Sequence, residues 1–448
     1  MKTNARRELP SVEKVLRLFG ETSLPRQTLL AVVRRELAEL RHSGSIPDQE
    51  AIVERIGCAV SGLLSQKIQP VINGTGVIIH TNLGRAPLGP KVVETLTQIA
   101  GRYTNLEYDL SAGARGGRAK YLEESLALLC SAQAATVVNN CAAALVLILR
   151  HFTKQKPEVI ISRGELIQIG GGFRIPDILE ASGARLREIG TTNKTGLNDY
   201  ACAIGPRTAL ILKVHRSNFF MDGFVASPST EEIAALAKKK KIPFVEDLGS
   251  GAIVSTEKVR GVEHEPTPSE TLRRGADLVC FSGDKLFGGA QAGIVAGRAR
   301  LVAALKREPF FRALRCDKLV LGALQATVDL YLRGQTEELP VLQMLRISVS
   351  ALRERAEEIR SRLSDLPVAV EIGEGKAQIG GGSLPRSSIP SITLDFAPRD
   401  PEAFARKLRN ASPPIVGFKS GKKFRLDLRT IFPSQDRALL TALRAASS

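Results

Sequence analysis

Between residues 90 and 300 the sequence alternates short apolar runs with longer segments of helical character. The runs are rich in Val, Ile and Leu and end in turn residues, which is typical of buried strands. They cover residues 136–138, 159–161, 186–189, 209–214, 244–246, 278–281 and 293–296. This alternation predicts an α/β fold in which helices cover both faces of a mostly parallel sheet.

The segments on either side differ in character. The first 66 residues contain three amphipathic stretches, which predict a small helical unit. The last part of the chain predicts helices at 317–333, 350–363 and 401–410 and strands at 368–372, 391–396 and 423–430. We therefore expect a helical domain at 1–66, a linker and active-site edge at 67–84, a large domain at 85–310 and a small α/β domain at 311–448.

The composition is that of an ordinary globular chain, with 448 residues of which 43% are hydrophobic. No apolar run reaches membrane-spanning length, and the first residues lack the apolar core of a signal peptide. The six cysteines are scattered, without a CxxC pair or a Cys/His cluster. We therefore expect a cytoplasmic protein with reduced thiols, no membrane association and no metal site.

The net charge of +17 is unusual and is spread along the chain. Such an excess favours a polyanionic partner, most often a nucleic acid, over a merely basic, well-solvated surface. Aromatic residues make up only 5% and Trp is absent, so stacking on single-stranded bases is a poor candidate mechanism. A structured RNA, bound through its shape and its phosphates, fits the composition better.

The run from Asp277 to Gly289 places a lysine directly after a buried strand. Lys285 is therefore expected at the sheet edge where open α/β folds bind ligands. A lysine buried there holds its proton less tightly and can act as a nucleophile or Schiff-base partner. The alternative is a lysine whose amine reaches solvent from a strand end.

Two other strand ends carry residues suited to a phosphate-bearing cofactor. At Asn140, Cys141 and Ala142 a strand gives way to a helix, whose free N–H groups and positive dipole end attract phosphate. An ordinary helix cap is the alternative there. Asp247 ends another strand ahead of a Gly/Ser loop, where it could hold a protonated ring nitrogen, bind Mg²⁺ or cap the turn.

The order of phosphate loop, acid and lysine fits pyridoxal phosphate, which needs a lysine for its aldehyde, a carboxylate for its pyridinium nitrogen and a helix N-terminus for its phosphate. Ser282 is placed to hydrogen-bond the phosphate. His215 ends the intervening strand and could stack on the ring or hydrogen-bond it, unless it is a satisfied structural histidine. A Walker nucleotide site and a GxSxG nucleophile elbow are disfavoured because neither motif occurs.

A series of motifs resembles, in sequence and order, the bacterial selenocysteine synthase family (L-seryl-tRNA(Sec) selenium transferases). These motifs are PVINGTGVIIHTNLGRAPL, NNCAAA, GELIQIGGGFRIPD, GTTNKT, KVHRSNFFMDGF, EDLGSGA, SGDKLFGGAQAGI and FFRALRCDK. Together they span residues 70 to about 330. The chain departs from the family pattern at Cys141, where Asn is usual, and at Phe287 and Ala290.

The resemblance implies a fold-type-I pyridoxal-phosphate enzyme that assembles as a homo-oligomer, a decamer built as a ring of dimers. It implies conversion of seryl-tRNA(Sec) to selenocysteinyl-tRNA(Sec) with selenophosphate, by loss of the seryl hydroxyl and addition of selenium. It makes Lys285 the Schiff-base lysine and Asp247 the pyridinium partner. It also makes Arg85, Arg312 and Arg315 candidates to bind the selenophosphate anion, because a guanidinium suits a phosphate well.

Two other functions stay open on the sequence alone. One is a pyridoxal-phosphate lyase or desulfurase acting on a small amino acid, which would have no need of the basic helical unit at 1–66. The other is a catalytically idle tRNA-binding relative, which would have no need of Lys285 and Asp247.

Overall fold

The computed structural model describes residues 9–19, 24–42, 47–168, 172 and 174–447. Part of the glycine-rich motif that begins at Gly164 therefore lies outside the described residues. The chain divides into two compact units, one formed by residues 1–72 with 406–415 and the other by residues 73–405 with 416–448. No helix in the described ranges is long and apolar enough to cross a membrane.

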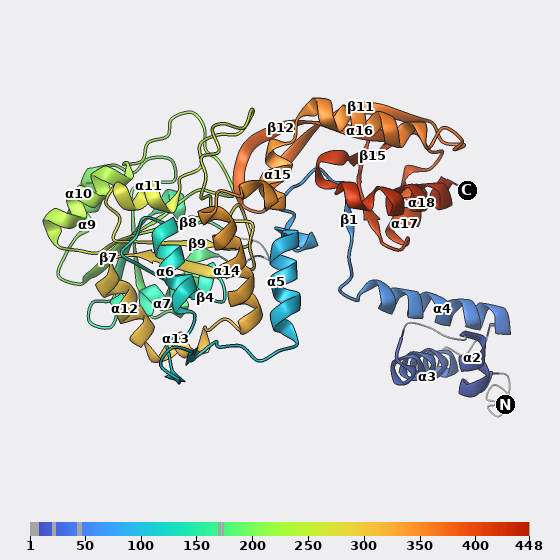
Figure 1. Ribbon diagram of the computed structural model, residues 1–448, viewed down its shortest axis with the longest axis horizontal. Coiled ribbons are helices and arrows are strands. Elements are labelled where there is room, and N and C mark those ends of the chain that lie inside the picture. Colours follow the sequence, from blue (N-terminus) through green and yellow to red (C-terminus); the bar gives the residue numbers. More distant parts are fainter. Residues whose placement is uncertain (1–8, 20–23, 43–46, 169–171, 173, 448) are drawn as a thin grey trace. The chain divides into compact units, whose positions relative to one another are not determined.

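The described part of the first unit contains three helices, α2 (Val12–Phe19), α3 (Arg26–His42) and α4 (Gln49–Ser65) (Figure 1). Asp48 begins α4, because its side chain accepts a hydrogen bond of 2.8 Å from the Ala51 N–H. Val33, Leu37 and Ile56 are fully buried in a core of the unit's own. The predicted helical character of this segment is confirmed.

The second unit contains a seven-stranded sheet in the order β4-β10-β9-β8-β7-β5-β6. All seven predicted strands are present, as β4 (Ala134–Val138), β5 (Glu158–Ser162), β6 (Arg185–Ile189), β7 (Thr208–Val214), β8 (Phe244–Gly249), β9 (Leu278–Ser282) and β10 (Gly293–Gly297). β10 runs antiparallel to both neighbours, and the other pairs are parallel. The carboxyl ends of β4, β7, β8 and β9 are therefore brought toward one region of the sheet edge.

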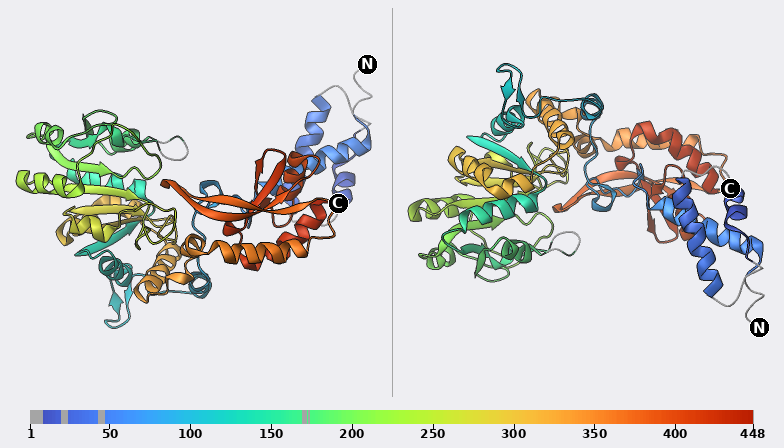
Figure 2. Two further views of the ribbon diagram at one scale, coloured as in Figure 1. Left: turned by 90° about the horizontal axis from the view of Figure 1, so that it is seen from above. Right: turned by 90° about the horizontal axis from the view of Figure 1, so that it is seen from below.

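Helices cover both faces of this sheet, as the alternating sequence predicts (Figures 1 and 2). One apolar layer receives side chains from α6 (Lys120–Leu129), α9 (Leu197–Ala203), α10 (Thr230–Lys240) and α14 (Lys318–Leu332). The opposite layer receives them from α7 (Cys141–Phe152), α8 (Ile175–Ala181) and α12 (Ala299–Arg307). Strands buried on both faces explain why their sequences are continuous apolar runs rather than alternating ones.

The C-terminal part of the second unit has an antiparallel sheet in the order β11-β12-β15-β14. Its strands are β11 (Val370–Gly380), β12 (Ser383–Phe396), β14 (Phe418–Ser420) and β15 (Lys423–Asp427), and α16 (Val349–Ser361) packs against it. Figure 2 shows the long β11–β12 hairpin with helices along one side. The smaller α/β layer is confirmed, whereas the domain boundaries given above stay predictions.

Several strand limits differ from the sequence-based expectation. β11 continues to Gly380 instead of ending at residue 372. β12 begins at Ser383 instead of residue 391. Pro385 and Pro390 lie in this extension, and prolines argue against a strand in the sequence. They are tolerated because β15 pairs with β12 only from Thr393 onward, so the earlier part of β12 pairs with β11 alone. The run expected to continue to residue 430 ends at Asp427, whose carboxylate accepts a hydrogen bond from Arg429 N–H and starts a 3₁₀ turn.

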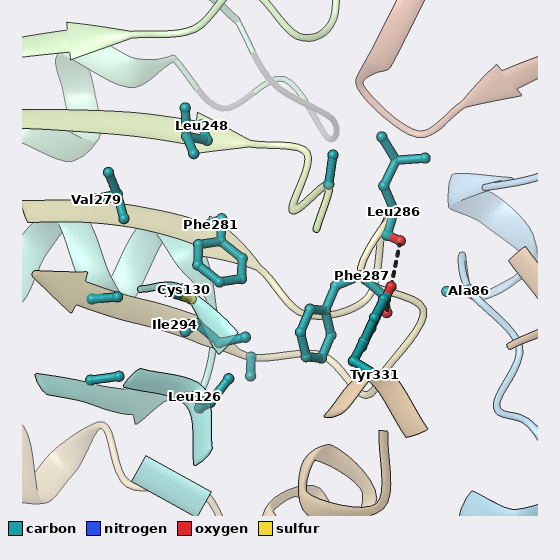
Figure 3. Packing of buried hydrophobic residues seen from close by; sticks show 14 of the residues in the cluster. Ala86, Leu126, Cys130, Leu248, Val279, Phe281, Leu286, Phe287, Ile294 and Tyr331 are labelled. Carbon is teal, nitrogen blue, oxygen red and sulfur yellow. Dashed lines mark hydrogen bonds between the residues drawn. The ribbon is translucent and has the colours of Figure 1, made fainter. Parts of the chain in front are cut away.

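The turn after β9 is fixed from several sides. Figure 3 shows Phe281, Phe287 and Tyr331 packed together. The ring centroids of Phe281 and Phe287 are 6.1 Å apart, and those of Phe287 and Tyr331 are 5.5 Å apart. The Tyr331 hydroxyl donates a hydrogen bond of 3.0 Å to the Phe287 carbonyl. Leu286 N–H donates to the Ser250 carbonyl at 2.9 Å. These contacts hold the backbone on either side of Lys285 and so define where its side chain starts.

Candidate active site

The strand ends surround a cavity of about 570 Å³, within the usual size of a small-ligand site. Eight of the ten residues expected at the site line it: Arg85, Asn140, Cys141, Ala142, His215, Asp247, Ser282 and Lys285. They come from segments spread over 200 positions of the sequence. All but Arg85 meet because they lie at or after the ends of β4, β7, β8 and β9 in one sheet. Arg312 and Arg315 do not line the cavity.

Lys285 extends from the turn that follows β9 into this cavity. Burial lowers the pKa of its amine, while electrostatic interactions with Cys141 and Asp247 oppose that shift. A lowered pKa increases the fraction of neutral amine, which is the form that attacks an aldehyde. The environment of Lys285 therefore suits a Schiff-base lysine.

Two glycines bring backbone close to this amine. A Cβ on Gly382 would lie 3.4 Å from Lys285 Nζ, and a Cβ on Gly249 would lie 3.9 Å from it. Both glycines have positive φ, +75° and +64°, which other residues rarely adopt. Gly382 belongs to the β11–β12 hairpin, so the C-terminal sheet contributes directly to the wall of the cavity.

Asp247 is 7% exposed and lies beside Cys280 of the neighbouring strand. Its Oδ1 accepts a hydrogen bond of 3.0 Å from Gly249 N–H and one of 3.4 Å from the Cys141 thiol. Burial raises the pKa of this carboxyl, and the nearby Lys285 lowers it. Cys141, expected among the cofactor-binding residues, thus has a defined contact with the acid.

The N-terminus of α7 forms another side of the cavity. Asn140 caps the helix, because its side-chain oxygen accepts a hydrogen bond of 2.8 Å from Ala143 N–H. The first N–H groups of a helix, here those of Cys141 and Ala142, have no partner within the helix. They are therefore available to an anion such as a phosphate.

Of the three arginines expected to bind an anion, Arg85 lines the cavity and the other two do not. Arg85 lines the cavity and donates a hydrogen bond of 2.8 Å from Nη1 to Asp284 Oδ2. Arg312 is exposed, and Arg315 lies 3.7 Å from the carboxylate of Glu107. Within the described residues of one chain, Arg312 and Arg315 therefore do not join Arg85 at the cavity.

Several cavity residues escape sequence reasoning. Ser217, Asn218 and Gln291 line the cavity together with Gly381 and Gly382. The run of three glycines before Ser383 was the available signal for the hairpin, since such a run marks a tight turn with positive φ. Asn218 Oδ1 is buried and, within the described chain, receives no hydrogen bond.

These residues fit pyridoxal phosphate. A buried amine and a buried carboxylate share a cavity with a helix N-terminus, and an orphaned side-chain oxygen leaves a polar group for a ligand to satisfy. The glycine backbone beside Lys285 Nζ leaves space that a side chain would fill.

Comparison with known proteins agrees with this chemistry. The family model for L-seryl-tRNA selenium transferase matches residues 71–432. The chain belongs to this family. L-seryl-tRNA(Sec) selenium transferase of Geotalea daltonii is 42% identical over 98% of this chain and 99% of its own. The protein of the same name from Aquifex aeolicus is 41% identical over 95% of each chain.

These L-seryl-tRNA selenium transferases span nearly the whole chain, including most of the N-terminal helical unit. They do not favour the alternative of a small-molecule lyase or desulfurase. Among solved structures, D-glucosaminate-6-phosphate ammonia-lyase has a TM-score of 0.59 and 18% identity, covering 87% of this chain and 98% of that chain. That likeness concerns the fold alone, and it supports the predicted fold-type-I class.

Proposed function

We propose that this protein converts L-seryl-tRNA(Sec) to L-selenocysteinyl-tRNA(Sec) with pyridoxal phosphate as cofactor and selenophosphate as selenium donor. The family match over residues 71–432 carries this proposal. The cavity supports it with a lysine, a carboxylate and a helix N-terminus suited to the cofactor. A location in the cytoplasm and a decameric assembly stay predictions from the sequence.

In this proposal Lys285 would hold the cofactor through its aldehyde, Asp247 would serve its ring nitrogen, and the start of α7 with Ser282 would hold its phosphate. Bound pyridoxal phosphate supplies an electron sink for the bond broken at the seryl Cα. Lys285, when displaced by the substrate amine, is then the base at that carbon. Asp247 keeps a positive charge on the ring favourable because it presents a carboxylate in a site with little water.

The proposal is tested by incubating the purified protein with seryl-tRNA(Sec) and selenophosphate and analysing the aminoacyl group released from the tRNA. Selenocysteine should form only when pyridoxal phosphate is bound. Borohydride reduction followed by peptide mapping should place the pyridoxyl group on Lys285, and a label on another lysine would contradict the site assignment. Conversion of free serine or cysteine, with no reaction of seryl-tRNA, would favour a lyase instead.

The donor site is a separate proposal. Arg85 lines the cavity, whereas Arg312 and Arg315 do not. The proposal is nevertheless that all three bind selenophosphate through charge-assisted hydrogen bonds, each contributing about 1.5–3 kcal/mol. Arg312→Ala should therefore raise the KM for selenophosphate roughly 10-fold or more while loss of the seryl hydroxyl continues. Arg307→Ala, another exposed arginine, is the control. An unchanged KM with slower loss of the hydroxyl would assign Arg312 to tRNA binding or to folding.

A further inference from the structure

His215 is held in place by a backbone hydrogen bond, and its side chain lies beside an acidic residue. Its N–H donates a hydrogen bond of 2.8 Å to the Asp247 carbonyl, which fixes it beside the buried carboxylate. Its ring lines the cavity that contains Lys285. Its Nε2 lies 3.3 Å from Glu265 Oε1. Because Nε2 faces Glu265, Nδ1 is the ring nitrogen left to serve the cavity.

Glu265 lies behind this histidine, outside the residues that line the cavity. It is 2% exposed, and its backbone N–H is anchored to Thr256 Oγ1 at 3.0 Å. Its Oε1 accepts no hydrogen bond within the described residues, so the imidazole of His215 is the partner within ion-pair distance. A buried carboxylate is costly unless a charge compensates it. Glu265 therefore orients the imidazole of His215 and fixes which ring nitrogen faces it.

We propose that His215 is the proton donor to the departing seryl hydroxyl and that Glu265 is the positioning residue that holds it. The inference rests on the proposed function, since it concerns loss of a hydroxyl from a seryl group. Hydroxide leaves poorly without a proton, and no acid for this step has been assigned above.

The proton count is balanced. A base takes the Cα proton, and the electron pair of that bond becomes the second bond between Cα and Cβ. The Cβ–O bond breaks with its electron pair on oxygen, which takes a proton from the imidazolium and departs as water. His215 is left neutral. Lys285 suits the first of these proton transfers because burial lowers the pKa of its amine. Lys285 would then remove the Cα proton, and His215 would protonate the departing hydroxyl.

The test compares two leaving groups on the same tRNA. Chloride needs no proton, whereas hydroxide does, so seryl-tRNA(Sec) and 3-chloroalanyl-tRNA(Sec) are given to wild type, His215→Gln and Glu265→Gln in single-turnover experiments. His215→Gln should react about 100- to 10,000-fold more slowly with the seryl substrate and within a few-fold of wild type with the chloroalanyl substrate. Glu265→Gln should show the same selectivity to a smaller degree, and Glu265→Asp should recover part of it.

A second measurement does not depend on turnover. The visible absorbance of bound pyridoxal phosphate should be unchanged in Glu265→Gln, because Glu265 does not line the cavity. In His215→Gln the cofactor should stay bound, and the same absorbance measures how much of it does. The matched control is His264→Gln. His264 is adjacent in sequence to Glu265, but its ring nitrogens face Glu257 at 3.2 Å and Glu270 at 3.4 Å and do not line the cavity. It should behave as wild type.

Equal slowing of both substrates, or loss of the cofactor absorbance, would overturn the proton-donor role and make His215 a residue of cofactor binding or folding. Normal rates with the seryl substrate in His215→Gln would assign the proton to another group. If Glu265→Gln reacts as fast as wild type with both substrates, Glu265 does not position His215. Failure of wild type to use either tRNA would instead contradict the proposed function, so the two failures are distinguishable.

Discussion

At the scale of single residues, Asp247 shows how neighbours prepare an acid for one task. Its Oδ1 is already held by Gly249 N–H and by the Cys141 thiol. These two donors fix the orientation of the carboxylate before any ligand binds, while the amine of Lys285 lies in the same cavity. A carboxylate so oriented can interact with a ring nitrogen without further ordering.

Asp247→Asn should retain pyridoxal phosphate but lose turnover on the order of 100-fold, because a neutral amide does not stabilise a protonated ring. Cofactor content is measured from visible absorbance and turnover from selenocysteine formed. Asp365→Asn, in an exposed pair with Arg444, is the control and should change neither. Near-normal turnover of Asp247→Asn would refute the role.

Glu165 is a second buried acid, 3% exposed, whose Oε2 accepts a hydrogen bond of 3.0 Å from Val214 N–H. Burial raises its pKa from 4.5 to about 7, with that hydrogen bond and the charge of Lys213 opposing the shift. The folded protein therefore holds a proton that the unfolded chain releases above pH 4.5. The contribution to stability is complete below pH 4.5 and is lost as the pH rises through about 7.

Glu165→Gln should remove this dependence, because glutamine can accept the same hydrogen bond and does not ionise. Relative to wild type, its free energy of unfolding should rise between pH 5 and pH 8 by up to about 3 kcal/mol. Denaturant unfolding at the two pH values measures it. Glu180→Gln, an exposed control, should follow wild type. Parallel pH profiles for Glu165→Gln and wild type would show that Glu165 ionises normally.

At the scale of elements, β10 and α7 meet at a point with no spare space. Gly293 of β10 lies between Val138 of β4 and Ser282 of β9. A Cβ on Gly293 would lie 2.1 Å from the Asn140 carbonyl oxygen and 3.0 Å from Cys141 N. The strand therefore supports the helix N-terminus that faces the cavity.

Gly293→Ala should displace the start of α7, with a destabilisation of about 1–3 kcal/mol and a weaker affinity for pyridoxal phosphate. Thermal unfolding and cofactor titration measure the two effects. Gly205→Ala is the matched control, because nothing lies within 4 Å of the added carbon. If Gly293→Ala keeps wild-type stability and affinity, the helix start tolerates movement and its position is not critical for the cofactor.

At the scale of the whole molecule, the helical unit and the catalytic cavity are built from separate parts of the chain. Residues 1–72 belong to one compact unit, and every residue that lines the cavity belongs to the other. Arg34, Arg35 and Arg41 are exposed on α3, where Arg35 also pairs with Glu36 at 3.0 Å. Since the net charge is +17, a polyanion such as tRNA would be attracted to both units.

Deletion of residues 1–66 should leave the visible absorbance of bound cofactor intact and abolish binding of seryl-tRNA. The replacement of Arg34, Arg35 and Arg41 by Gln in the full chain should weaken binding and flatten its salt dependence, because fewer phosphate contacts are made. Filter binding at several salt concentrations measures both variants. Unchanged tRNA affinity after the deletion would assign tRNA recognition to the second unit.

The local sequence was enough to predict the sheet and the main chemistry of its edge. Seven short runs specified the seven strands. Six of these strands are buried, because burial on both faces requires continuous apolar residues, whereas the edge strand β6 is mostly exposed. Asn140 and Lys285 follow β4 and β9, and Asp247 lies near the end of β8. These three strands run in the same direction in one sheet, so their carboxyl ends lie at the same edge. The position of a residue at a strand end is thus set by the order of the strands in the sheet.

Tertiary structure decided the contacts between distant segments, which no local sequence pattern indicates. Gly382 reaches Lys285 from a hairpin about a hundred residues later, Glu265 lies behind His215, and Arg315 faces Glu107 instead of the cavity. Each of these contacts depends on how two distant segments pack, and neither segment alone carries a periodicity or spacing that would indicate the other. Secondary structure follows from repeating local patterns, whereas side-chain pairs between distant segments are set by the packing of the whole unit.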